Sequence, residues 1–431
     1  MNKEIYRLAL PSILSNITIP LLSSVDIFLV SQDSLVAMGA VGLGATIFNF
    51  IYWNFGFLRM GTTGLTAQSY GAKDKPEVDQ HLLRSVMMGV VISLGILIFS
   101  PLIKELAFSL MKLNQQQIPL VEVYFDIRIM AAPATLGLYC TLGWLFGVQN
   151  AMYPLIITVA TNLINIFFGY IFVKYYSLGI EGVAWATVIA QYVGFLLSLI
   201  FVRRLFDLRR DSLNKIFLFS KVLKVFKLNR DLFFRTFFLT LTMSYFTMLS
   251  SGLGVEALAV NVVFLQVVSW LSFLIDGYAY ALESLVGRFV GEKSHKEFFL
   301  VILTVFIQTG TLCLGLGFLL YFYTPFIFSF FNADTSFLKV LNSQRFMFAL
   351  IPLVSFSSYL WDGVFVGLTA SFDMMKSMVF AAAVFFLGVK FFGDELTLTN
   401  LWILYFSFLL MRSFAQTYYF FIKKNYLSSL K

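Results

Sequence analysis

Charged residues are scarce in this sequence. Asp, Glu, Lys and Arg together make up 13% of the 431 positions, whereas a soluble globular chain carries about 25%. Hydrophobic residues make up 59%, and long apolar runs recur from one end of the chain to the other. This composition excludes an ordinary soluble domain and indicates a chain that is dissolved in lipid.

Cysteine and histidine are also scarce, with two residues of each. Cys140 and Cys313 lie in separate apolar runs, so they show neither the spacing of metal ligands nor a disulfide framework. His81 and His295 lie beside charged residues near the ends of apolar runs. We therefore expect no metal site and no cofactor.

Catalytic motifs are missing as well. The sequence contains no HExxH zinc helix and no GxSxG elbow, and its glycine-rich segment 61–68 lacks the Gly-Lys-Ser/Thr ending of a phosphate-binding loop. These absences argue against an intramembrane enzyme, and we expect no enzymatic activity.

Runs long enough to cross a bilayer dominate what is present. A spanning helix needs about 20 mostly apolar residues. On that basis the chain contains twelve spans, at residues 6–30, 35–67, 80–103, 117–146, 152–174, 180–203, 231–251, 255–287, 298–322, 338–366, 373–392 and 398–422. The second, fourth, eighth and tenth are long, so we expect them to be tilted or to extend past the bilayer.

The basic residues predict the topology. If the N-terminus is cytoplasmic, the inner loops hold most of the Lys and Arg residues, and the outer loops hold little beyond Lys104, Lys112, Lys174 and Lys339. This asymmetry predicts a multi-pass protein of a bacterial inner membrane with both termini in the cytoplasm. The net charge of +8 is then explained by anchoring beside the membrane, and we expect no nucleic-acid partner.

A basic segment divides the chain into two halves. Residues 205–230 interleave Arg and Lys with Phe, Leu and Val, which is typical of an amphipathic stretch on an anionic lipid surface. The predicted organisation is an N-terminal lobe at 1–204, this cytoplasmic linker, and a C-terminal lobe at 231–431, with six spans in each lobe.

The two halves are related to each other. A constant shift of 220 residues pairs Tyr139 with Tyr359 and the segment 143–147 with 363–367. Because each half holds six spans, the two copies have the same orientation and would be related by a pseudo-two-fold axis along the membrane normal. The predicted fold is therefore an all-α membrane protein of twelve transmembrane helices in two six-helix lobes.

Asp26 is an acid within a strongly apolar span, where an unpaired ionisable residue costs several kcal/mol. The matching region of the second half, residues 232–255, has no acid, which favours a functional role over maintenance of the fold. The alternative is hydration near the outer interface. Pro11 and Pro20 precede Asp26 in the same span, and each removes a backbone donor, so they are candidate hinges or static kinks.

The fifth span adds two asparagines. Asn162 and Asn165 are three residues apart and lie on one face of the predicted helix. They would either form a network with Asp26 or bond to a neighbouring helix.

The second half has its own polar candidates, which would line a cavity and attract cations. These are Asp276, Glu283, Asp362, Asn261 and Gln266. The alternative for the acids is pairing with intramembrane bases, namely Arg128, Arg345, Lys390 and Arg412.

Several of these segments resemble the multidrug and toxic compound extrusion (MATE) transporters. Leu8-Ala9-Leu10-Pro11 followed by Asp26, together with the segment 61–68, resembles their first half. The segments 257–261, 276–279 and 362–367 resemble the DNA-damage-inducible F (DinF) branch of the family. The resemblance covers essentially the whole chain.

This resemblance implies a secondary active antiporter, which exports cationic or amphipathic organic compounds in exchange for H⁺ or Na⁺ while its lobes rock. It places the polar cluster of the first lobe on Asp26, Tyr124, Asn165 and Thr187. Some relatives have a second acid in the fifth span where this chain has Gly169, and the sodium-coupled branch has a glutamate in the seventh span that is absent here. Both departures favour a proton site centred on Asp26.

Other functions remain open at this point. A flippase of a lipid-linked precursor would share the fold but would need an amphipathic groove that is open to lipid. A non-transporting receptor fits the paired halves and buried acids poorly. As partners we expect a small organic substrate and membrane lipids, and we expect a monomer.

Overall fold

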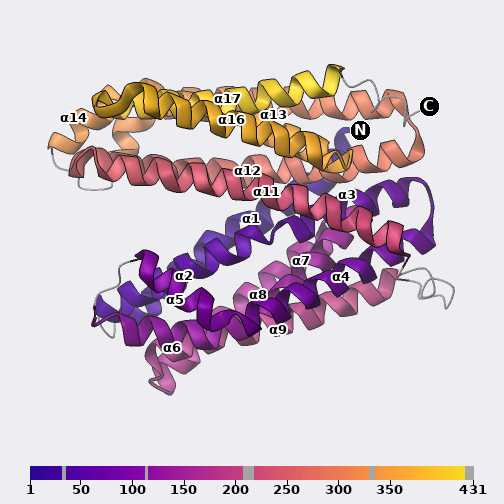
Figure 1. The fold of residues 1–431 in the computed structure, drawn as a ribbon, viewed down its shortest axis with the longest axis horizontal. Coiled ribbons are helices and arrows are strands. Elements are labelled where there is room, and N and C mark those ends of the chain that lie inside the picture. The colour runs from indigo at the N-terminus through magenta and orange to yellow at the C-terminus, as the bar shows by residue number, and fades with distance from the viewer. Residues whose placement is uncertain (32–34, 112–114, 207–217, 330–334, 423–431) are drawn as a thin grey trace. The chain divides into compact units, whose positions relative to one another are not determined.

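The computed structural model describes residues 1–31, 35–111, 115–206, 218–329 and 335–422 (Figure 1). Within these ranges the chain is helical and contains no strand, which confirms the predicted all-α fold class. Eleven helical segments of the described chain are long and apolar enough to cross a membrane. The helix at the start of the chain covers the first predicted span in addition.

The first half of the chain forms helices α1 to α9. Their bounds are α1 Asn2–Ser31, α2 Leu35–Asn54, α3 Phe57–Gly71, α4 Lys75–Ile98, α5 Ser100–Met111, α6 Ile118–Arg128, α7 Ala132–Gly147, α8 Met152–Tyr170 and α9 Gly179–Leu205. A 3₁₀ turn at Ile129–Ala131 joins α6 to α7, and a π turn at Ile171–Tyr175 ends α8.

The second half forms helices α11 to α17. Their bounds are α11 Phe219–Ser251, α12 Val255–Glu292, α13 His295–Ser329, α14 Thr335–Ser343, α15 Arg345–Gly367, α16 Ser371–Phe392 and α17 Leu398–Ile422. Of the predicted linker, residues 207–217 lie outside the described residues, and its end forms the first turns of α11.

Three of the four long predicted spans are divided into two helices each. Their length predicted tilt or extension past the bilayer, and it did not reveal these breaks. The second is broken between α2 and α3, the fourth at the 3₁₀ turn, and the tenth between α14 and α15. The fourth has a clear physical cause, since Pro133 stands in the first turn of α7 and has no N–H to continue the hydrogen-bond ladder. The eighth is one continuous helix of 38 residues.

The helices pack into two compact units. One unit contains Leu10–Lys227, and the other contains Met1–Ala9 and Leu228–Lys431. The first nine residues therefore pack with the second half of the chain, and the first turns of α11 pack with the first half. We call these the first unit and the second unit.

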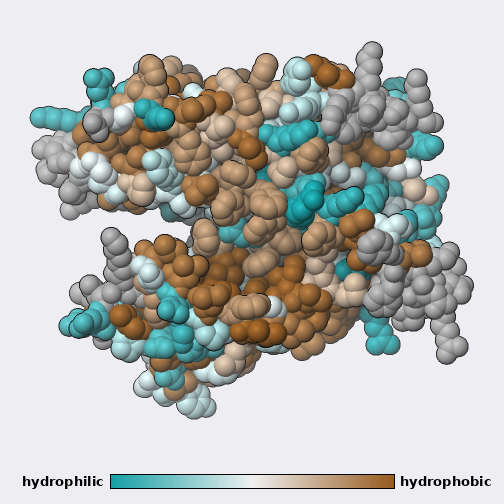
Figure 2. Space-filling model, viewed as in Figure 1, coloured by the Kyte–Doolittle hydropathy of each residue, from teal (hydrophilic) through white to brown (hydrophobic). Residues whose placement is uncertain are grey.

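Each unit has an aromatic and aliphatic core. In the first unit, Trp144 is fully buried and its indole Nε1 donates to the carbonyl of Val78 at 2.9 Å. In the second unit, Phe246 and Phe264 pack against Trp402, with ring centroids 5.2 and 5.4 Å apart. Many large hydrophobic side chains outside these cores are exposed, and they cover much of the surface seen in Figure 2, as expected of a surface that contacts lipid.

The internal repeat is visible in the backbone packing. A Cβ atom built on Gly143 of α7 would lie 2.4 Å from the carbonyl oxygen of Arg59 in α3, and one built on Gly363 of α15 would lie 2.5 Å from that of Ala279 in α12. Both the glycines and their partners differ by the 220-residue shift found in the sequence. The same glycine-dependent helix contact, in which small residues let two backbones approach closely, therefore occurs in both units.

This contact predicts that Gly143→Ala destabilises the protein. Alanine should gain about 1 kcal/mol of helix propensity, but its methyl group would overlap the Arg59 carbonyl, and such overpacking costs about 1–3 kcal/mol. The matched control is Gly42→Ala, because Gly42 is also helical and a Cβ there meets no atom within 4 Å. Thermal unfolding in detergent should show a lower melting temperature for Gly143→Ala only. Equal shifts in both variants would contradict the close approach.

Candidate functional site: buried polar clusters in each unit

Asp26 lies near the end of α1, inside the first unit. Its side chain is 9% exposed, and its Oδ1 atom is fully buried without a hydrogen-bond partner. No ion pair to Asp26 occurs among the described residues. Because a buried polar atom without a partner is rare and calls for an explanation, this carboxylate is the first candidate for a binding role.

Arg128 and Tyr124 of α6 face Asp26. Arg128 is within electrostatic range of Asp26, and the Tyr124 hydroxyl interacts with Arg128. The guanidinium lies over the Phe48 ring at 5.1 Å, yet its Nε and Nη1 atoms are buried without hydrogen bonds. Gly44 of α2 makes room for the tyrosine, since a Cβ there would lie 2.4 Å from the Tyr124 ring. The result is an acid and a base that share a buried site without closing a salt bridge.

The asparagines of α8 contact two different helices. Asn165 is fully buried and donates from Nδ2 to Thr187 Oγ1 of α9 at 2.9 Å, while its own Oδ1 atom has no partner. Asn162 donates to Thr18 Oγ1 of α1 at 2.8 Å. Neither asparagine hydrogen-bonds to Asp26. The residues of the predicted cluster therefore interact in two sets, Asp26 with Tyr124 and Arg128, and Asn165 with Thr187.

The candidate hinges lie in an unbroken helix. Pro11 and Pro20 are both within α1, which is helical from Asn2 to Ser31. The boundary between the two units falls at Ala9–Leu10, directly before Pro11.

Asp362 of α15 is a buried acid of the second unit, and both of its carboxylate oxygens accept hydrogen bonds. Its Oδ2 atom accepts from both Arg412 of α17 and Arg235 of α11, and its Oδ1 atom accepts from Gln416 at 2.8 Å. The Arg412 side chain is 1% exposed and lies over the Tyr359 ring. This network supports the pairing alternative for Asp362.

The other candidates of the second half occupy varied environments. Asn261 accepts from the Trp402 indole at 2.6 Å and donates to Ser250, so it joins α12 to α17 and α11. Glu283 is buried at 2% exposure, Asp276 is partly buried, and Gln266 is exposed. Two of the bases predicted as possible partners of these acids have other surroundings. Arg345 donates to the backbone carbonyl of Phe322 at 3.2 Å, and Arg128 lies in the first unit.

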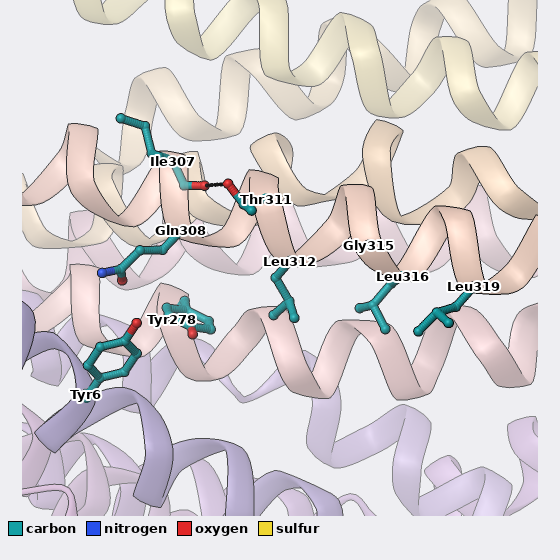
Figure 3. Close-up of a pocket in the computed structure, with 9 residues that line it drawn as sticks. All are labelled: Tyr6, Tyr278, Ile307, Gln308, Thr311, Leu312, Gly315, Leu316 and Leu319. Atoms are coloured by element: carbon teal, nitrogen blue, oxygen red, sulfur yellow. Dashed lines mark hydrogen bonds between the residues drawn. The ribbon is translucent and has the colours of Figure 1, made fainter.

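The second unit contains a cavity that sequence patterns did not indicate. It has a volume of about 590 Å³ and lies among α13, α12 and the start of α1 (Figure 3). None of the five polar candidates of the second half lines it. The lining residues are Tyr6, Tyr278, Ile307, Gln308, Thr311, Leu312, Gly315, Leu316 and Leu319.

Membrane-spanning helices in two repeated units, each with a buried polar cluster, define a polytopic membrane transporter. The model of the MatE family matches residues 11–171 and, a second time, residues 232–392. The chain therefore belongs to the multidrug and toxic compound extrusion family and is an efflux transporter of that family. The offset of 221 residues between the two matches agrees with the internal repeat.

The chain is similar to curated proteins over most of its length. It is 33% identical to DNA damage-inducible protein F of Escherichia coli over 89% of this chain and 84% of that protein. It is 26% identical to the chloroplastic protein DETOXIFICATION 44 of Arabidopsis thaliana, over 96% of this chain and 81% of that protein. The predicted membership of the family and its DinF branch is confirmed.

Solved structures agree with the fold. A MATE protein in its bent conformation superposes with a TM-score of 0.85 at 20% identity and covers 100% of this chain and 96% of that chain. The Vibrio cholerae transporter VcmN in its bent form gives 0.84 at 16% identity, over 99% of this chain and 96% of that chain. The twelve-helix, two-lobe architecture of such transporters is the fold predicted from the sequence.

The Asp362 network predicts a large loss of stability in Asp362→Leu. This change would leave Arg412 and Arg235 buried without their anion, and removal of one partner of a buried pair costs about 3–5 kcal/mol. The matched control is Asp126→Leu, because Asp126 pairs with Lys104 at an exposed site, where ion pairs are worth about 0–1 kcal/mol. Thermal unfolding in detergent measures both, and the account fails if the two variants lose equal stability.

Proposed function

We propose that this protein is a proton-coupled antiporter that exports amphipathic organic compounds, including cations, with Asp26 as the coupling carboxylate. The observation that carries this proposal is the buried, unpartnered Oδ1 atom of Asp26. Asp362, a buried acid of the second unit, instead accepts hydrogen bonds from two arginines and a glutamine. Asp26 can therefore take up and release a cation without the prior break of a salt bridge.

The environment of Asp26 favours a proton over Na⁺. A metal cation must exchange its water shell for several oxygen ligands, whereas a proton needs only the carboxylate. Arg128 places a permanent positive charge within electrostatic range of Asp26, and like charges repel strongly in a medium of low dielectric constant. Position 169 of α8 is a glycine, so it provides no second carboxylate that could coordinate Na⁺.

Arg128 also makes the two protonation states of Asp26 unequal. While Asp26 is ionised, its charge offsets that of the guanidinium. When Asp26 takes up a proton, Arg128 becomes a buried cation without an anion, which is costly. Protonation therefore changes the electrostatic energy of the site that Asp26 of α1 and Arg128 of α6 share, and this change supplies a driving force for a conformational step.

The proposed transport cycle depends only on this difference in energy between the two protonation states of Asp26. A compound binds from the cytoplasm while Asp26 is ionised, and the lobes rock outward. A proton from outside then neutralises Asp26 and lowers the affinity for the compound, which leaves. The proton is released inside. Coupling of this kind requires that the two ligands have opposite effects on one conformational equilibrium. The protein acts as a monomer without a cofactor in the inner membrane, with cytoplasmic termini.

Asp26→Asn should abolish efflux that is driven by a pH gradient. The amide cannot exchange a proton, but it has nearly the shape of the carboxyl group, so the protein should fold. The matched control is Asp126→Asn, the same chemical change at an exposed acid of the first unit. Efflux of a fluorescent cationic dye from liposomes measures both variants. Gradient-driven efflux by Asp26→Asn at the rate of the control would refute the role of Asp26.

Arg128→Gln should relax the preference for protons. Without the fixed positive charge, Na⁺ should begin to compete for Asp26, so a sodium gradient should drive efflux in the variant but not in the unaltered protein. Arg345→Gln is the control, since that arginine lies in the second unit and donates to backbone carbonyls. If the sodium response of Arg128→Gln equals that of the unaltered protein, Arg128 does not set the ion preference.

A further inference from the structure

The cavity of the second unit has a polar end and an apolar wall. Leu312, Leu316 and Leu319 point from α13 toward α12 and form the wall (Figure 3). The polar end is formed by the hydroxyl groups of Tyr6 and Tyr278 and the amide of Gln308, which lie together on the side away from Leu319. This combination of a mostly apolar lining with a few polar groups is typical of small-molecule sites, and the volume of about 590 Å³ falls within their usual range of about 300–1,000 Å³.

The polar end contains an unused acceptor. Gln308 donates from Nε2 to Asn2 Oδ1 at 3.3 Å, but its Oε1 atom is buried and has no hydrogen-bond partner. A buried acceptor in this state is stabilised by any ligand that brings an N–H or O–H group. A ligand of this cavity is therefore expected to carry a hydrogen-bond donor that reaches Gln308 Oε1.

The polar end of the cavity lies beside the first residues of the chain, since Gln308 contacts Asn2 and Tyr6 lines the same end. The apolar wall extends from there along α13 to Leu319. This arrangement suits a compound with a hydrogen-bond donor at one end of an apolar body, and the volume of the cavity suits a molecule of drug size.

The cavity is accessible from outside its unit. Ile307 and Leu319, at its two ends, are 59% and 50% exposed. Gly315 lies between them, and the space beside it is unoccupied, because a Cβ built there meets no atom within 4 Å. Since α13 is a candidate membrane span, a compound dissolved in the bilayer can reach the cavity along this face.

We propose that this groove is a binding site for amphipathic organic molecules of drug size that carry an N–H or O–H donor. It would collect exported compounds from the membrane and would be separate from the Asp26 site. The assignment of its ligands as exported compounds rests on the proposed function.

Gly315→Leu tests the groove directly. A Cβ atom on residue 315 meets no atom within 4 Å, so there is room for a leucine side chain, which would occupy part of the apolar end of the cavity. The probe is ethidium, a planar cation with two aromatic amino groups, and its binding to purified protein in nanodiscs is followed by fluorescence anisotropy. We expect the dissociation constant to rise at least about tenfold in Gly315→Leu. Gln308→Leu should raise it about three- to tenfold through loss of the acceptor.

Gly95→Leu of α4 is the matched control. A Cβ on Gly95 also meets no atom within 4 Å, and this residue lies in a span of the first unit, so ethidium binding should not change. Melting temperatures of all variants show whether each is folded. Unchanged binding in folded Gly315→Leu, or equal weakening in Gly95→Leu, would overturn the proposal.

Native mass spectrometry distinguishes a lipid from a drug-like ligand. If Gly315→Leu loses a co-purified phospholipid but keeps its ethidium affinity, the groove is a lipid site and the proposal is wrong. Efflux by the unaltered protein under a pH gradient is measured separately. Its absence would refute the proposed antiport, whereas a failure of the groove alone would leave that antiport intact.

Discussion

The cost of burying charge among apolar helices governs this structure. A charge in such a setting has to be paired, or it marks a site where a ligand or proton binds. In the second unit the charge of Asp362 is paired, since Arg235, Arg412 and Gln416 all donate hydrogen bonds to its carboxylate. In the first unit Asp26 and Arg128 share one buried site with unused atoms on both, and this is the basis of the proposed proton site.

The internal repeat explains how one fold supports both arrangements. The glycines at 143 and 363 make the same close contact in each unit, so the crossing of the paired helices is preserved. The polar residues around that crossing have diverged. Tyr359 accepts a hydrogen bond from Ser272 in the second unit, where the first unit has Tyr139 and, at the position of Ser272, Tyr52. A shared scaffold therefore holds a closed polar network in one half and an open one in the other.

The spans could be predicted from the sequence because lipid imposes one long apolar run per crossing. The repeat could be predicted as well, because close backbone contacts fix glycines at constant spacing. The breaks were missed where length was the only signal, although Pro133 marks one of them. The neighbours of each acid could not be predicted, since they depend on how helices are rotated against one another. Arg235, a partner of Asp362, is not among the intramembrane bases that the sequence indicated, and Arg128, which is among them, lies in the first unit.

Competition between a proton and the exported compound at Asp26 is the central claim, and it can be measured without a membrane. Purified protein in weakly buffered detergent, near the pH at which Asp26 is half protonated, is mixed with ethidium while a pH indicator is recorded. The account predicts that binding of the dye releases protons from the unaltered protein and releases none from Asp26→Asn. Dye binding without proton release, or equal release from both proteins, would contradict it.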